Sequence, residues 1–200
     1  MGLRARDVGL LALVALVALA VCAALGVRAR DAPAPPGPIA DGGADDEPFI
    51  AFARDFRGFL RWERHLVEGA MMPVGAPDGP SYVYLNRRAP AGARRWPNGT
   101  IVVKTIEAGA RDEWTIHAMV KRGVPYNDDG AIGWEYFELR LAPGADEPVV
   151  VWRGPGPPSG HGYAARGRDA GAGEIPLVCD DCHAAGWRSD GVLTPALALR

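Results

Sequence analysis

The feature that most constrains this chain is the run Cys179-Asp180-Asp181-Cys182-His183. A C-x-x-C-H run is typical of c-type haem attachment, in which two thiols bond to the haem vinyl groups and the adjacent imidazole ligates the iron. Half a zinc site or a redox dithiol has the same spacing, but zinc needs a second pair of ligands. The third cysteine, Cys22, lies in an apolar run. The motif therefore predicts one covalent haem c, held by Cys179 and Cys182, with His183 on the iron.

The N-terminus has the pattern of an export signal. Arg4 and Arg6 precede an uncharged, largely apolar run over residues 8–27. A run of about 20 apolar residues is also long enough to span a bilayer. Residues 1–30 therefore predict either a cleaved signal peptide or an uncleaved membrane anchor. Both place the rest of the chain in the periplasm, either secreted or tethered to the membrane through residues 8–27.

Composition divides the remaining chain into a linker and a domain. Residues 31–48 are rich in Pro, Ala, Gly and Asp, which predicts a semi-stiff linker. Residues 49–200 are enough for one domain. The 22 Lys and Arg residues are balanced by 24 Asp and Glu residues. This balance offers no basic stripe of the kind that nucleic acids require, so we exclude nucleic-acid binding.

The domain begins with an apolar pattern at helical spacing. Phe49, Phe52, Phe56 and Leu66 lie on one side of this pattern, which predicts an amphipathic helix up to Gly69. Its other side carries four arginines, namely Arg54, Arg57, Arg61 and Arg64. A solvated face is the simplest interpretation of these arginines, and a docking face for an acidic redox partner is the alternative.

Five runs rich in Val, Ile, Tyr and Trp predict strands over residues 81–85, 100–107, 114–121, 132–141 and 149–152. The connections between them are too short for crossover helices, so we expect antiparallel pairing. The predicted fold is α+β and mainly β: an antiparallel sheet of about five strands, one N-terminal amphipathic helix and a C-terminal haem-attachment segment.

The second predicted strand contains a lysine on an apolar face. Alternation along this strand puts Lys104 on the same side as Val102 and Ile106. One interpretation is that the side chain snorkels at a sheet edge. The other is that its ammonium is desolvated near the haem, which would lower its pKa and produce a neutral, nucleophilic amine.

Three segments together resemble the cytochrome P-460 family over most of residues 49–200. They are WPNGTIVVK at 96–104, GWEYF at 133–137 and the C-terminal C-x-x-C-H. The resemblance implies a small antiparallel β fold, usually a homodimer, with Lys104 at the position of the family's lysine. In hydroxylamine-oxidising members that lysine is cross-linked to the porphyrin. Cytochrome c′-beta proteins have the same fold and bind NO or CO without the cross-link.

The resemblance also implies a distal carboxylate in hydroxylamine-oxidising members, on the strand after the lysine strand. Here the aligned residue is His117, and Glu113 or Glu135 is an alternative source of a carboxylate. Imidazole also carries out acid–base chemistry near neutral pH. Alternation puts His117 on the side of Thr115 and Met119, so a core or face-exposed histidine remains an equal alternative.

We therefore expect a mono-haem c-type cytochrome that binds and oxidises hydroxylamine or NO at an open iron position, with Lys104 and His117 as its catalytic residues. Its redox partner would be a protein such as another c-type cytochrome. One alternative is a non-enzymatic protein that binds NO or CO in a pocket walled by the helix phenylalanines. Another is an electron-transfer cytochrome with methionine as sixth ligand, for which the candidates are Met71, Met72 and Met119.

Overall fold

The computed structural model describes residues 47–68, 78–157 and 179–199. The chain divides into residues 1–40 and residues 41–200, and every described residue lies in the second unit. The predicted export segment and residues 31–46 of the predicted linker lie outside the described residues. Within the described ranges, no helix combines the length and the apolar character needed to cross a membrane.

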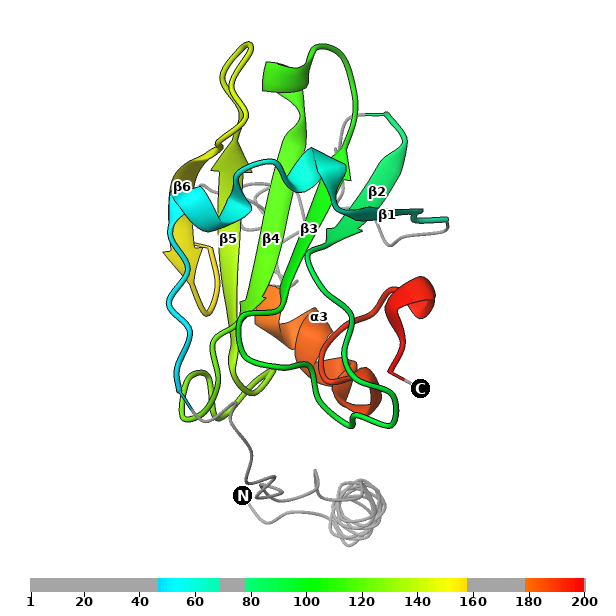
Figure 1. The fold of residues 1–200 in the computed structure, drawn as a ribbon, viewed down its shortest axis with the longest axis vertical. Coiled ribbons are helices and arrows are strands. Elements are labelled where there is room, and N and C mark those ends of the chain that lie inside the picture. The colour runs from blue at the N-terminus through cyan, green and yellow to red at the C-terminus, as the bar shows by residue number, and fades with distance from the viewer. Residues whose placement is uncertain (1–46, 69–77, 158–178, 200) are drawn as a thin grey trace, which may run out of the picture. The chain divides into compact units, whose positions relative to one another are not determined.

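Six strands form one antiparallel sheet in which each strand pairs with the next along the chain (Figure 1). The strands are β1 (Glu63–Leu66), β2 (Ser81–Leu85), β3 (Ile101–Ile106), β4 (Thr115–Lys121), β5 (Trp134–Arg140) and β6 (Val149–Gly154). The predicted mainly β, antiparallel fold is confirmed, and β2 to β6 match the five expected strands. The sheet has six strands rather than five, because β1 adds an edge strand.

The predicted amphipathic helix is wrong over its described residues. This stretch forms two short 3-10 helices, η1 (Ala53–Phe56) and η2 (Phe59–Arg61), and then enters β1. Gly58 separates the two helices with a φ of 69°, a left-handed conformation that glycine adopts without strain. Phe56 and Phe59 are both buried, so their spacing reflects packing against the sheet rather than one continuous helix.

Each face of the sheet carries its own apolar cluster. On one face, Phe56 and Phe59 pack with Phe137 and other strand residues. On the other face, Val102, Met119 and Tyr136 pack with C-terminal residues. The helix α3 (Cys179–Ala185) lies on this second side, since Cys179 packs against its cluster. We call the side of the sheet that carries Val102, Met119 and Tyr136 the α3 face.

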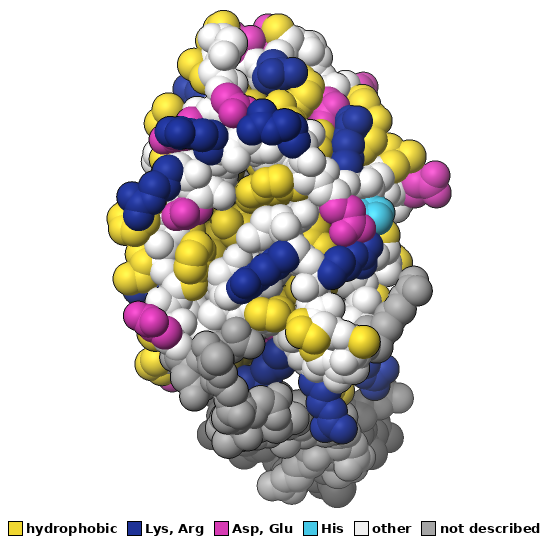
Figure 2. All heavy atoms as spheres, viewed as in Figure 1, with side chains coloured by type: hydrophobic (Ala, Val, Ile, Leu, Met, Phe, Trp, Pro, Cys, Tyr) yellow, Lys and Arg dark blue, Asp and Glu magenta, His cyan; other side chains and the backbone are white. Residues whose placement is uncertain are grey.

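The predicted arginine row is exposed and largely paired. Arg57 contacts Glu147, Arg61 lies 3.1 Å from Asp146, and Arg64 lies 3.0 Å from Glu107. On the surface shown in Figure 2, Lys and Arg side chains alternate with Asp and Glu side chains. This mixture favours the solvated-face interpretation over a docking face for an acidic partner.

Candidate haem site

The helix α3 carries the whole C-x-x-C-H motif. Cys179 and Cys182 lie three residues apart, which places their side chains on the same side of the helix. Both are free thiols. Burial raises the pKa of Cys179 to about 12. The motif therefore offers two unbonded sulfur atoms on one helical turn, one of them packed toward the α3 face.

His183 is oriented by a backbone carbonyl. Its Nδ1 lies 2.6 Å from the carbonyl oxygen of Gly191, and a carbonyl can only accept, so Nδ1 carries the proton. The other ring nitrogen, Nε2, is then the unprotonated one that a metal can bind. Burial also lowers the pKa of His183, which keeps the imidazole in the neutral form that a metal ligand needs.

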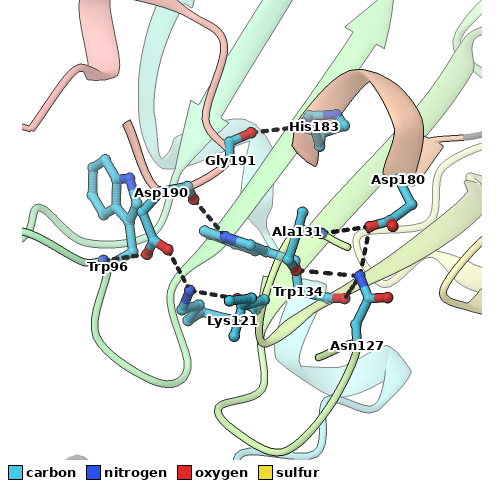
Figure 3. A network of polar contacts seen from close by, with 10 residues as sticks. Trp96, Lys121, Asn127, Ala131, Trp134, Asp180, His183, Asp190 and Gly191 are labelled. Atoms are coloured by element: carbon cyan, nitrogen blue, oxygen red, sulfur yellow. Dashed lines mark hydrogen bonds and ion pairs between the residues drawn. The ribbon is translucent and has the colours of Figure 1, made fainter. Parts of the chain in front are cut away.

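Asp180 fastens α3 to the loop between β4 and β5. Its Oδ1 accepts hydrogen bonds from Asn127 Nδ2 at 2.5 Å and from the backbone N–H of Ala131 at 2.9 Å (Figure 3). The Tyr136 hydroxyl also donates to this oxygen, at 3.3 Å. The Tyr136 ring is itself in contact with the imidazole of His183, with 5.3 Å between ring centroids. One carboxylate thus holds the C-x-x-C-H motif against the sheet.

A row of three ionisable side chains crosses the α3 face. Lys104 on β3 lies opposite His117 on β4, and His117 lies opposite Glu138 on β5. Residues directly opposite each other on neighbouring strands have Cβ atoms about 4.5–5.5 Å apart. Strand pairing therefore brings an amine, an imidazole and a carboxylate side by side, and we call these three residues the polar row.

Lys104 lies in the middle of the sheet. Because β3 pairs with both β2 and β4, the interpretation of Lys104 as a lysine snorkelling at a sheet edge is wrong. The side chain makes no hydrogen bond or ion pair within the described ranges, and burial lowers its pKa. A positive charge on Lys104 also contributes to lowering the pKa of His183, so Lys104 lies close enough to the α3 imidazole to affect its charge state.

Sequence reasoning missed Glu138. Its Oε2 accepts a hydrogen bond from Trp152 Nε1 at 2.8 Å. The register shifts between Glu138 and Leu139, and this irregularity puts Val151 and Trp152 in the same cluster on the α3 face. Such bulges often re-aim side chains beside functional sites. Alternation from Tyr136 could have placed Glu138 on this face, but not beside His117.

The two carboxylates suggested from the sequence lie elsewhere. Glu135 points to the opposite side of the sheet, where it pairs with Arg153 at 2.7 Å. Glu113 accepts a hydrogen bond from the backbone N–H of Ala110 at 2.8 Å, at the start of η3 (Arg111–Glu113). Neither side chain lies opposite His117, and Glu138 is the carboxylate that the sheet places next to it.

The structure also shows where His117, the candidate methionine ligands and the phenylalanines lie. His117 shares its side of β4 with Met119, as alternation indicated, and Met119 is buried in the α3-face cluster. Of the phenylalanines proposed as walls of a gas pocket, Phe56 and Phe59 pack against the face opposite α3. Met71 and Met72 lie outside the described residues.

The residues present fit a c-type haem. Besides two free thiols and one neutral imidazole nitrogen, the segment before β3 holds two buried polar atoms without a hydrogen-bond partner, Trp96 Nε1 and Thr100 Oγ1. A bound group with acceptor atoms would satisfy such donors. No group of three or more His, Cys, Asp and Glu residues within the described ranges is arranged to hold a metal ion. None of the protein-family models, curated proteins or solved structures compared with this chain matches it.

Proposed function

We propose that this chain is a mono-haem c-type cytochrome of P-460 type, which binds and oxidises hydroxylamine or NO at an open iron position. The observation that carries the proposal is the position of α3 on the face of the sheet that holds the polar row. Cys179 and Cys182 would tether the haem, and His183 would ligate its iron. The haem, when bound, supplies the redox chemistry.

Lys104 has the properties of a reactive amine. Burial lowers its pKa, so it gives up its proton more readily than a lysine in water. Within the described ranges no carboxylate is paired with it to hold the charged form. A neutral amine is a nucleophile, so Lys104 is available to bond to the porphyrin or to contact a small bound molecule.

His117 and Glu138 are suited to accept protons. Oxidation of a substrate that carries N–H and O–H groups releases protons together with electrons. An imidazole takes up a proton near neutral pH, and a carboxylate beside it stabilises the resulting cation. We assign proton removal from the substrate to these two residues of the polar row.

The export pattern of residues 1–30 supports a periplasmic location for this chemistry, with residues 8–27 either cleaved or kept as a membrane tether. Electrons would leave to a redox partner protein such as another c-type cytochrome. The resemblance further implies a homodimer, which sedimentation velocity on the haem-loaded protein would test.

The first experiment tests haem attachment. The variant carrying both Cys179→Ala and Cys182→Ala should release its haem into acidic acetone, whereas the matched variant Cys22→Ala should keep it. In His183→Ala the ferrous spectrum should change, because the axial nitrogen is lost. Haem that stays bound in the double cysteine variant, without a bond to lysine, would contradict the attachment.

The second experiment tests the enzyme against its alternatives. Lys104 and Lys121 are the only lysines of the chain, so peptide mass spectrometry can assign a haem–lysine bond without ambiguity. If the protein is an enzyme, we expect a bond at Lys104, loss of hydroxylamine oxidation in Lys104→Ala, and slower oxidation in Glu138→Gln than in the control Glu113→Gln.

The two alternatives give other results. A ferrous protein that binds CO but has neither a lysine bond nor hydroxylamine turnover would be a gas binder. A CO-insensitive protein that responds to CO after Met119→Ala would be an electron carrier.

A further inference from the structure

A buried ion pair between Lys121 and Asp190 joins the end of β4 to the turn that follows α3. Neither residue belongs to the C-x-x-C-H motif. Lys121 Nζ, at the end of β4, lies 2.7 Å from Asp190 Oδ1, and the two side chains are only 6% and 11% exposed. Burial pushes the pKa of Lys121 down and that of Asp190 up, and their attraction opposes both shifts. A buried ion pair is a poor source of net stability, because desolvation cancels much of its attraction.

The ion pair and the hydrogen bonds around it hold Asp190 in place. Asp190 Oδ2 accepts a hydrogen bond from the backbone N–H of Trp96 at 2.8 Å, and the Asp190 carbonyl accepts one from Trp134 Nε1 at 2.6 Å (Figure 3). Lys121 Nζ also donates to the carbonyl of Ile132 at 2.8 Å. Asp190 is thus held through both its side chain and its main chain, in a left-handed conformation with a φ of 50°.

The next residue is Gly191, whose carbonyl orients the proximal imidazole. Gly191 has a φ of 81°, and a Cβ atom there would lie 3.1 Å from Cδ1 and Nε1 of Trp134. The backbone at Gly191 therefore lies close against the indole that donates to Asp190. Holding Asp190 fixes the direction of the Gly191 carbonyl, and this carbonyl lies 2.6 Å from His183 Nδ1.

We propose that Lys121, Asp190 and Trp134 are positioning residues for the axial imidazole, acting through the Gly191 carbonyl. This inference rests on the proposed haem function and adds a means of tuning it. A hydrogen bond from Nδ1–H to a fixed acceptor makes the imidazole a stronger electron donor and holds its ring plane. A stronger donor favours the ferric state, so the three residues lower the reduction potential of the haem.

The test uses haem-loaded full-length protein and two conservative changes. Trp134→Phe removes the indole N–H and keeps an aromatic ring. The double variant Lys121→Met with Asp190→Asn removes both charges together, leaves no unpaired buried ion, and keeps an acceptor for Trp96. Resonance Raman spectroscopy of the ferrous protein would report the iron–histidine stretching frequency, and spectroelectrochemistry would report the potential.

Both variants should show a lower iron–histidine stretching frequency and a higher reduction potential than the wild type. The matched control is Glu135→Gln, which removes the charge of a buried carboxylate that pairs with the partly exposed Arg153 on the opposite face and should move neither value. Unchanged frequency and potential in haem-loaded Trp134→Phe and in the double variant would overturn the inference while leaving the haem function standing. Wild-type protein without covalent haem would instead overturn the proposed function.

Discussion

At the level of single residues, Lys104 lowers the free energy of unfolding. Its ammonium is partly buried within the sheet and has no hydrogen bond or ion pair within the described ranges, and burial lowers its pKa. Burial of a polar group without a partner costs about 1–3 kcal/mol in mutational data. A residue retained at such a cost is a good candidate for a functional role.

Lys104→Met in the haem-free chain should raise the free energy of unfolding at pH 7 by about 1–3 kcal/mol. Burial lowers the pKa of Lys104 in the folded chain below the ordinary lysine value of 10.5, so the stability gained by Lys104→Met is full below the folded-state pKa. This gain in free energy of unfolding should shrink as the pH rises from the folded-state pKa to 10.5. Urea unfolding across this range measures it. The Lys104→Arg variant keeps its charge at high pH, so its free energy of unfolding should not rise toward that of Lys104→Met there. A difference in free energy of unfolding between Lys104→Met and the wild type that does not depend on pH would contradict the burial argument.

Cys179 should react slowly while the haem-free chain is folded. With a pKa of about 12, about one thiol in ten thousand is a thiolate at pH 8, and the thiolate is the nucleophile. We expect iodoacetamide at pH 8 to leave the Cys179 peptide unlabelled in the folded chain and to label it in urea. Mass spectrometry of the peptides reads the result, and equally fast labelling in both states would show that this thiol is accessible.

At the scale of elements, α3 is too short to be stable alone. It has seven residues, whereas isolated helices shorter than about 12 residues are marginal in water. Its position depends on contacts with the loop between β4 and β5, above all through Asp180. The C-x-x-C-H motif therefore takes its geometry from the sheet rather than from helix propensity.

Asp180→Ala should lower the free energy of unfolding by about 2–4 kcal/mol, because it leaves Asn127, Ala131 and Tyr136 without a shared acceptor. The covalent haem yield should fall with it, since α3 would no longer be held. Asp181→Ala, at the neighbouring exposed position, is the matched control and should cost much less. Urea unfolding and the haem-to-protein ratio are the measurements, and equal losses in the two variants would contradict the role of Asp180.

At the scale of the whole molecule, the sheet separates an aromatic core on one side from the proposed haem site on the other. Phe56 and Phe137 pack edge to face on one side, with 5.1 Å between ring centroids. The polar row and α3 occupy the other side. Adjacent residues of one strand therefore belong to different clusters, because their side chains point to opposite faces.

This separation predicts opposite effects for two neighbouring substitutions. Phe137→Ala should cost about 3–5 kcal/mol of stability through loss of packing and leave the CO spectrum of the haem unchanged. Glu138→Gln should cost little stability and alter the pH dependence of hydroxylamine oxidation. Thermal unfolding and CO difference spectra distinguish the two. A shifted CO spectrum in a folded Phe137→Ala protein would show that the two sides are coupled.

Local sequence patterns account for five of the six strands, for the strand neighbours that share a side with Lys104 and with His117, and for the C-x-x-C-H motif. Each of these follows from local spacing, either the two-residue period of a strand or a fixed motif. The remaining features depend on contacts between segments of the folded chain. β1 is a mostly polar edge strand that exists because β2 pairs with it. Strand register brings Glu138 beside His117. A contact between distant segments brings Lys121 beside Asp190. Neither contact follows from a local period in the sequence.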